Sequence, residues 1–368
     1  MTNDLLSMQD ALASAWGGPV RLAPAVTFEV HEHVQRLSVE HAPAGAPATV
    51  ILKRARDGFG LQSTDPDSPA SLLFNVWASL EFLQEIFGET SPLPRLYAGD
   101  RQAGWLVMED LPDSYPLHQA LWGNDPLRAQ RELLRFAQML GELHARALPR
   151  TARYLELRQA LGCFFPIATH DPGPLLHGWV QTLEQLGLGL PAAALDELQG
   201  VTEVLDRPAG SLTFMHGNAI PTNLAETGGR LRLHDCEESG LRHALLEGVN
   251  LRMLFPTCGL KFVRRFPEAV WRPAEAAYRA ALAAICPAVA ADESYARALT
   301  ADDDPRVDHV RRCRLARYDA FVQTAAEFDR LPHLRRYFID LASSLRERWP
   351  GAADELALYP AFEPKAGD

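Results

Sequence analysis

The residue types best suited to chemistry lie in one stretch, 212–240, which reads LTFMHGNAIPTNLAETGGRLRLHDCEESG. An apolar run leads into a His-Gly-Asn sequence that ends on Asn218, and Asn223 follows five residues later. After a Gly-Gly turn, a strand-like RLRLHD ends on Asp235. Mg²⁺ takes oxygen ligands, keeps several waters and accepts substrate phosphates. The pattern therefore predicts a loop on which Asn218 aligns a hydroxyl acceptor while Asn223 and Asp235 hold the metal.

Less specific interpretations of the same stretch stay open. An Asn-rich turn explains the HGNxxxxN spacing about equally well. Glu237 and Glu238, shortly after Asp235, either face a substrate or form a solvated acidic turn. We expect His216 to support the loop through hydrogen bonds rather than to act as a base.

Lys53 is the second candidate, at the end of the strand-like segment TVILK. A flexible ammonium group beside a sheet can act as a point charge on nucleotide phosphates, whereas many lysines at strand ends simply face solvent. A carboxylate that pins Lys53 could come from Glu81 or Glu85 in the next helical segment. Glu81 falls between the positions of that segment's apolar stripe, which favours a solvated side chain over a partner for Lys53.

Antiparallel strands and one helix must position Lys53. Alternating apolar and polar residues indicate half-buried strands. The segments with the character of strands are 26–34, 34–42, 49–53, 95–99 and 104–111. Short turns join the first three, which predicts a meander-type antiparallel sheet. A polar, turn-rich segment, 57–70, precedes a helix at 71–87 that has a broad apolar face.

The chain beyond Pro112 and the DSYP sequence is predominantly helical. Helical spacing of apolar residues predicts helices near 129–146, 174–187, 191–206, 267–287, 306–329 and 332–348. A short amphipathic helix, 1–16, opens the chain. We therefore predict an α+β fold with two lobes: a small β-rich lobe with its hinge at 1–111, and a larger helical lobe at 112–368 that carries the hairpin. A cleft between two such lobes is a common ligand site.

Composition and motifs exclude other classes of protein. The net charge of −11 gives no electrostatic support for a nucleic-acid partner, and it is compatible with a cationic small substrate. The five cysteines lack CxxC or CxH spacing, which predicts reduced thiols without a zinc site or disulfides. The amino terminus does not have the regions of a signal peptide, and no apolar run approaches the ~20 residues that span a bilayer. We expect a cytoplasmic protein with no membrane contact.

Taken together, VILK, WLVMEDL and the HGN…N…LHD pattern resemble the aminoglycoside phosphotransferase and choline-kinase-like family of small-molecule kinases, across about 20–260. The resemblance implies a bilobal protein-kinase-like fold whose small lobe binds the nucleotide. It implies that ATP lies between the lobes with its adenine against the hinge residues Met108, Glu109 and Leu111. Lys53 would then meet the phosphates, and Asn223 and Asp235 would hold Mg²⁺.

Two residues depart from the family's pattern. The family's usual loop is HGDxxxxN, whereas this chain has HGNAIPTN, so Asn218 replaces the catalytic Asp. Val76 occupies the position at which the family's lysine-pinning Glu aligns. A carboxamide accepts a hydrogen bond from a hydroxyl but cannot take its proton at neutral pH. General-base help is worth ~10²–10⁴-fold in rate, or roughly 3–5 kcal/mol, although phosphoryl transfer depends mostly on positioning and metal electrostatics.

Two hypotheses about function follow. The first is a Mg-ATP-dependent phosphotransferase that acts on a hydroxyl of a small molecule, slowed by Asn218. The second is a catalytically silent, pseudokinase-type nucleotide-binding or scaffold protein of the same fold. A cleft that binds a ligand other than a nucleotide is a third class.

Overall fold

A five-stranded antiparallel sheet forms the amino-terminal part of the protein. This computed structural model describes residues 2–27, 33–55, 69–111, 115–163, 172–185, 187–206, 210–253, 255, 264–287, 290, 310–348 and 356–364. The strands are β1 (Arg21–Thr27), β2 (Val34–His41), β3 (Thr49–Arg54), β4 (Leu96–Asp100) and β5 (Trp105–Glu109). Their spatial order is β1-β2-β3-β5-β4, so β5 inserts beside β3 instead of extending the meander.

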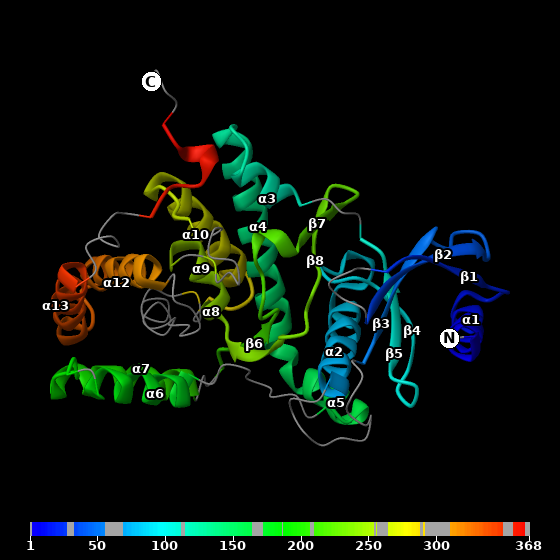
Figure 1. The fold of residues 1–368 in the computed structure, drawn as a ribbon, viewed down its shortest axis with the longest axis horizontal. Helices are drawn as coiled ribbons and strands as arrows, with labels where there is room; N and C mark the ends of the chain where they lie inside the picture. The colour runs from blue at the N-terminus through cyan, green and yellow to red at the C-terminus, as the bar shows by residue number, and fades with distance from the viewer. Residues whose placement is uncertain are drawn as a thin grey trace.

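One helix covers each face of this sheet (Figure 1). Val50 and Leu52 of β3 pack with Met8 and Leu12 of α1 (Thr2–Trp16) on the outer face. Side chains alternate between the faces of a strand, so the next residue, Lys53, lies on the opposite face. That face carries α2 (Pro69–Phe87) and looks toward the rest of the molecule.

The larger lobe is built around α4 (Pro126–Ala147), which packs closely against α10 (Glu268–Ala283). Beside them lie the helices α3 (Pro116–Leu121), α5 (Thr151–Leu161), α8 (Leu245–Gly248) and α9 (Asn250–Met253). The lobe also holds two antiparallel strand pairs: β6 (Leu212–Met215) with β9 (Gly240–His243), and β7 (Leu224–Thr227) with β8 (Arg230–Leu233). Among the described residues, short 3₁₀ turns lie at Gly88–Thr90, directly after α2, and in the large lobe at Leu148–Arg150, Pro221–Asn223 and Pro360–Phe362.

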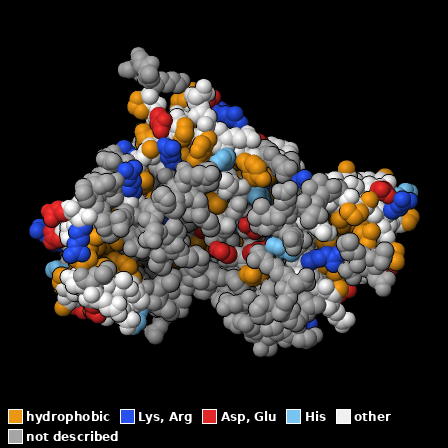
Figure 2. All heavy atoms as spheres, in the orientation of Figure 1, with side chains coloured by type: hydrophobic (Ala, Val, Ile, Leu, Met, Phe, Trp, Pro, Cys, Tyr) orange, Lys and Arg blue, Asp and Glu red, His pale blue; other side chains and the backbone are white. Residues whose placement is uncertain are grey.

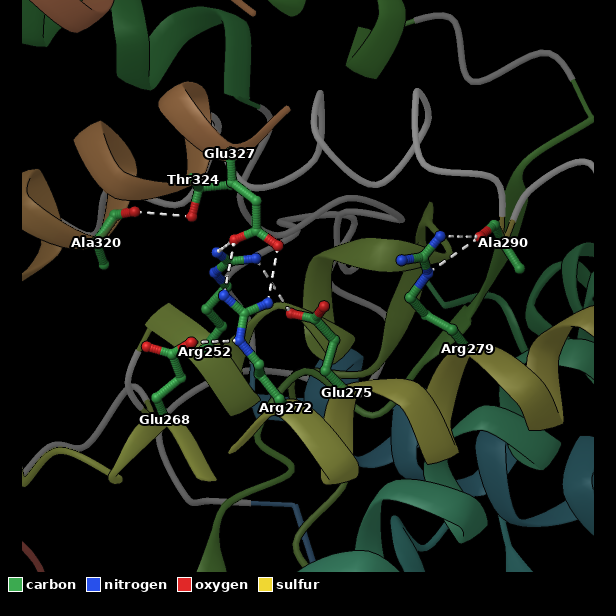
Figure 3. Close-up of polar contacts among 9 residues, drawn as sticks. All are labelled: Arg252, Glu268, Arg272, Glu275, Arg279, Ala290, Ala320, Thr324 and Glu327. Atoms are coloured by element: carbon green, nitrogen blue, oxygen red, sulfur yellow. Dashed lines mark hydrogen bonds and ion pairs between the residues drawn. The ribbon is translucent and has the colours of Figure 1, made fainter. Parts of the chain in front are cut away.

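Four helices gather at the end of the large lobe away from the sheet (Figure 1). They are α6 (Pro172–Gln185), α7 (Ala192–Asp206), α12 (Val310–Glu327) and α13 (Pro332–Arg348). Five charged residues, which we call the charge clamp, join the end of α12 to α9 and α10 (Figure 3): Arg252, Glu268, Arg272, Glu275 and Glu327.

Within the clamp, one carboxylate serves two arginines. Glu327 accepts hydrogen bonds from Arg252 and, at 2.8 Å, from Nη1 of Arg272. Nε of Arg272 also donates to Glu268 at 2.6 Å, and Nη1 of Arg252 lies 3.6 Å from Glu275. The buried guanidinium of Arg252 stacks over the ring of Trp271 at 4.4 Å. These contacts fasten α12 to the body of the lobe.

The structure confirms the α+β class, the β7–β8 hairpin and the long helices expected from the sequence. The predicted start of the first strand, residue 26, was wrong, because β1 begins five residues earlier; residues 28–32 of the predicted segment lie outside the described part of the chain. Pro24 and two register shifts interrupt the alternating pattern of this edge strand. The polar segment predicted at 57–70, and the residues just after the predicted lobe boundary at 111, lie largely outside the described residues.

Five regular elements of the large lobe were missed: α3, α5, α8, α9 and β9. The sequence of α5, TARYLELRQAL, carries no continuous apolar stripe, and β9 has only four residues. Among the helices that the structure describes, none combines the length and the apolar character needed to cross a membrane.

Candidate active site

The His-Gly-Asn loop follows β6 and is held by a buried carboxylate. The backbone N–H of His216 donates to Glu247 Oε2 at 3.1 Å, and that of Gly217 donates to Oε1 at 2.6 Å. Gly217 has a φ of +82°, and a Cβ at this position would lie 2.1 Å from the carbonyl oxygen of Glu238. Only glycine fits, because both the backbone conformation and the close approach exclude a side chain.

Glu247 is ionised although it is buried. Burial raises the pKa of a carboxyl, but hydrogen bonds from His144 and from the backbone of Gly217 outweigh it and hold the pKa of Glu247 below its ordinary value. His144 Nε2 lies 3.0 Å from Glu247 Oε2, and His144 Nδ1 lies 2.9 Å from the hydroxyl of Tyr278. Sequence reasoning missed Glu247, since a single glutamate in LLEG has no distinguishing spacing. Its charge fixes the conformation of the candidate catalytic loop.

His216 supports the same loop from within. Its side chain is fully buried, and Nδ1 accepts a hydrogen bond from the backbone N–H of Asn218 at 3.3 Å. Burial lowers the pKa of His216, an effect that the nearby carboxylates of Glu247 and Asp235 only partly offset. The imidazole is therefore neutral near pH 7 and orients the backbone that presents Asn218.

The hairpin brings the two predicted metal ligands together with Asn218. Asn223 Nδ2 donates to the carbonyl oxygen of Asn218 at 3.0 Å, and the N–H of His234 donates to the carbonyl oxygen of Asn223 at 3.0 Å. Asn223 and Asp235 thus flank the open end of the β7–β8 pair. Asp235 is exposed and has a φ of +62°, a left-handed conformation that is rare outside glycine and is often found at functional sites.

Three oxygen-bearing groups of this loop remain available for a ligand. Within the described chain, the side chain of Asn218, Oδ1 of Asn223 and the carboxylate of Asp235 have no hydrogen-bond partner. The described residues contain no group of three or more His, Cys, Asp or Glu side chains arranged around a metal. An oxygen-only pair from Asn223 and Asp235 nevertheless suits Mg²⁺, which is commonly bound by one or two protein oxygens, several waters and substrate phosphates.

Lys53 reaches this loop from the small lobe. Its Nζ lies 2.5 Å from Oε1 of Glu237, two residues after Asp235, and the two side chains are 8% and 19% exposed. Glu237 is its one ion-pair partner among the residues that the structure describes. The chain contains 36 lysines and arginines, of which three are lysines: Lys53, Lys261 and Lys365. A protein that uses arginine almost throughout therefore has a buried lysine at this position.

Asn75 of α2 docks the segment that carries Glu237. Its Nδ2 donates to the carbonyl oxygens of Glu237 and Ser239, at 2.8 and 2.9 Å. Its Oδ1 accepts from the hydroxyl of Tyr154 at 3.0 Å and from Nη1 of Arg158, both on α5. This network gave no signal in the sequence, because its members lie on three separate elements.

The positions of α2 from which the sequence suggested a partner for Lys53 do not supply one among the described residues. Val76 is buried in the apolar core, and Glu85 pairs with Arg153 at 2.8 Å. Glu81 is half-buried and forms no ion pair with any described residue. Lys53 is therefore neutralised from the loop and not from the helix.

Two residues of the predicted hinge form ion pairs, one with the large lobe and one within the small lobe. Nη2 of Arg232, on β8, donates to Glu109 Oε2 at 2.7 Å. Arg36 of β2 donates to both carboxylate oxygens of Asp110, at 2.7 and 3.0 Å. Met108 is half-buried and Leu111 is buried. The side chain of Glu109 thus ties β5 to the hairpin that carries Asp235.

Acidic and basic side chains are both exposed near the junction of the lobes. Figure 2 shows Asp and Glu atoms in the middle of this face, with His and Lys or Arg atoms beside them toward the small lobe. A separate hollow of about 310 Å³ lies in the small lobe, lined by Trp16, the 43–47 turn, Gln84 and 95–97. No candidate site residue lines that hollow.

Comparison with known proteins shows the fold of this chain. No protein-family model and no curated protein sequence matches the chain. Among solved structures, the chain resembles a candidate aminoglycoside phosphotransferase from Ralstonia eutropha, with 14% identity, a TM-score of 0.50 and coverage of 94% and 98% of the two chains. It also resembles a choline kinase from Streptococcus pneumoniae, with 12% identity, a TM-score of 0.41 and coverage of 93% and 99%. A macrolide 2′-phosphotransferase from Brachybacterium faecium shows 14% identity, a TM-score of 0.41 and coverage of 92% of this chain and 97% of that chain.

The likeness to the Ralstonia protein, which extends over nearly the whole of both chains, concerns the fold. This chain has a bilobal protein-kinase-like fold, like that of the candidate aminoglycoside phosphotransferase. The fold that the sequence motifs implied is confirmed.

Proposed function

We propose that this chain is a phosphotransferase of the aminoglycoside phosphotransferase and choline-kinase-like family. It transfers the γ-phosphate of ATP, bound as its Mg²⁺ complex, to a hydroxyl of a small molecule. The acidic net charge of −11 makes cationic metabolites the first acceptors to test.

One observation carries this proposal: Lys53 from the small lobe meets the segment that follows Asp235 in the large lobe. These residues are 182 positions apart, yet the Lys53 partner Glu237 is only two residues from Asp235. A cation for phosphates and a carboxylate for a metal therefore lie at the same junction between lobes. This is the pairing of groups that phosphoryl transfer from a nucleotide requires.

Each residue has a defined part in the proposed reaction. Asn223 and Asp235 would hold Mg²⁺, which neutralises charge on the phosphates as the phosphoryl group is transferred. Lys53 would donate N–H groups to phosphate oxygens, and the hinge from Met108 to Leu111 would contact the base. Asn218 would accept a hydrogen bond from the acceptor hydroxyl and align it. Because a carboxamide cannot take the proton, the hydroxyl loses it later, to the transferred group or to solvent.

A catalytically silent nucleotide-binding protein is the second candidate function. Two observations favour it: Asn218 replaces the catalytic Asp of the family's usual loop, and α2 presents Asn75 and Val76 rather than a carboxylate. This candidate predicts nucleotide binding without turnover.

Calorimetric titration with Mg·ATP, run beside an acceptor-panel assay for ADP release, separates the two candidates. The proposed function predicts binding, acceptor-dependent ADP release, and loss of that release in Asp235→Ala. Asn218→Asp should raise the rate by up to ~10²–10⁴-fold, the usual range for a general base. Binding without release in the wild type, with release restored by Asn218→Asp, would instead identify a silent relative. Absence of any nucleotide binding would overturn both candidates.

A further inference from the structure

The carboxylate that neutralises Lys53 comes from an unexpected place. Glu237 lies in the segment between β8 and β9, directly beyond the hairpin end that carries Asp235. A buried lysine without a counter-charge is costly, so its partner determines where the ammonium group lies. The position of Lys53 is therefore set by the same short segment that carries Asp235.

The backbone around Glu237 is fixed on both sides. Asn75 holds the carbonyl oxygens of Glu237 and Ser239, and Oγ of Ser239 lies 2.6 Å from Oγ of Ser79 on α2. On the other side, the carbonyl oxygen of Glu238 fills the space that a side chain on Gly217 would need. Glu237 thus projects from a segment that is packed between α2 and the catalytic loop.

The ammonium group of Lys53 retains capacity for a ligand. It has three N–H donors, and one carboxylate is its partner in the described structure. A lysine that is oriented by one charge and has donors to spare can bind phosphate oxygens without first breaking its ion pair.

We propose that Glu237 is the positioning residue for Lys53 and replaces the helix-borne carboxylate of this fold, an inference that rests on the proposed nucleotide function. In this arrangement α2 contributes an amide, Asn75, which anchors the loop, and the loop contributes the charge. The phosphate-binding lysine and the metal-binding Asp235 then move as one unit, so a change at Glu237 weakens the binding of Mg·ATP.

The scarcity of lysines makes a direct test practical. Acetylation with acetic anhydride, read by peptide mass spectrometry, reports Lys53 separately from Lys261 and Lys365, which serve as internal references. Without nucleotide, Glu237→Gln should speed the acetylation of Lys53 by about tenfold, which corresponds to an ion pair of about 1.4 kcal/mol. In the wild type, Mg·ATP should protect Lys53, and Glu237→Gln should raise the half-protecting concentration by about tenfold.

Matched variants separate positioning from a general structural effect. Glu81→Gln removes a carboxylate from α2 that pairs with no described residue, so both readouts should stay at wild-type values. Glu237→Asp keeps the charge on a shorter side chain and should give intermediate values. The thermal unfolding midpoint of each variant, measured in parallel, identifies any loss of folded protein.

The outcomes distinguish this inference from the proposed function. If Mg·ATP protects Lys53 equally in the wild type and in Glu237→Gln, or better in the variant, the positioning role is wrong and the nucleotide function stands. If Glu237→Gln exposes Lys53 but Mg·ATP protects it in neither protein, the ion pair is real and the nucleotide function is overturned. Unchanged acetylation in Glu237→Gln would overturn the ion pair itself.

Discussion

Two clusters of opposite charges in this molecule are built in different ways. The charge clamp joins three helices, and its carboxylate Glu327 is shared by two arginines (Figure 3). Arginine suits this role because its planar fork makes several hydrogen bonds and stacks on aromatic rings, as Arg252 does on Trp271. Beside the hairpin, by contrast, the lysine has a single carboxylate partner among the described residues, Glu237, whose Oε1 also lies 3.8 Å from Nε2 of His33.

The difference separates a structural cluster from the proposed binding site. In the clamp, each arginine meets two carboxylates of the protein, and the partners come from α9, α10 and α12. Next to Lys53, ligand capacity is left over: donors on the ammonium group, and oxygens on Asn223 and Asp235 without a partner in the described chain. Surplus polar capacity together with a left-handed Asp235 supports the proposal that a ligand completes this site.

Breaking the clamp should have the largest effect on stability. Arg252→Ala removes a side chain that is 4% exposed, takes one cationic neighbour from Glu275 and ends the stacking of Arg252 on Trp271. A buried pair broken from one side costs about 3–5 kcal/mol, which chemical denaturation would measure. The control is Arg272→Ala, because that side chain is 45% exposed and should contribute less than about 1 kcal/mol. Equal losses in the two variants would contradict a clamp centred on Arg252.

Acidification should weaken the region around the catalytic loop before the clamp. Burial lowers the pKa of His243 from 6.5 to about 4 and also lowers that of His216. Between these pH values the unfolded chain binds more protons than the folded one. The contribution of the neutral histidines to the free energy of unfolding is therefore complete above pH 6.5 and is lost as the pH falls toward 4. His243 alone accounts for about 3 kcal/mol over that window. The pKa of Glu327 is lowered mainly by its hydrogen bond from Arg272, so the clamp loses stability only below the ordinary 4.5 of a glutamate.

Unfolding midpoints measured from pH 7.5 to 4.5 would check this order of events. His243→Asn keeps an acceptor for the N–H of Leu245, which His243 Nδ1 now accepts at 3.3 Å, and removes the titrating group. The slope of stability against pH should therefore become shallower between pH 6.5 and 5. A variant with the slope of the wild type would show that His243 does not account for the loss.

The hairpin and its loop could be predicted from the sequence, because their signals are local. HGN, Asn223 and Asp235 follow one another within 20 residues, and the Gly-Gly turn fixes the pairing of β7 with β8. The protein-kinase-like fold could be predicted from the order of such motifs. The start of β1 could not, because Pro24 and two register shifts disturb the alternation on which strand prediction depends.

The partners of the site residues could not be predicted, because they are set by packing between distant segments. Lys53 and Glu237 are 184 positions apart, and the sequence favoured neither Glu237 over its neighbour nor the loop over α2. Glu247 lies 30 residues beyond the Gly217 N–H that it accepts, in a segment without any motif. Asn75 lies next to Val76, the position that aligns with the family's lysine-pinning Glu. The amide of Asn75, and not a carboxylate, contacts the loop.

Loss of the Asn75 amide should have an intermediate effect. Asn75→Leu keeps a similar volume but removes the amide N–H donors to the carbonyl oxygens of Glu237 and Ser239, and the Oδ1 that accepts from Arg158. Unsatisfied buried groups of this kind cost about 1–3 kcal/mol. Hydrogen exchange should accelerate in segment 236–240 more than in the β7–β8 pair. Uniform exchange across both would contradict a local anchoring role.

Removal of the Lys53 charge should have the smallest effect on stability and a large one on binding. Lys53→Met retains an apolar stem of similar length and leaves Glu237, which is 19% exposed, close enough to solvent to be hydrated. The expected change in unfolding free energy is about 1.4 kcal/mol, the value of the ion pair, whereas the affinity for Mg·ATP, measured by calorimetry, should fall at least about tenfold.

Lys53→Arg sharpens this last contrast. The chain uses arginine at almost every other basic position, so a simple requirement for positive charge would be met by the substitution. A guanidinium is planar and larger than an ammonium, and it forms a bidentate fork with a single carboxylate. Beside Glu237, the N–H groups of that fork would donate to the carboxylate and would no longer be available to phosphate oxygens. The affinity for Mg·ATP should therefore stay as low as in Lys53→Met. If Lys53→Arg binds Mg·ATP with wild-type affinity, positive charge alone is sufficient at this position, and the compact ammonium group with its additional N–H donors is not required.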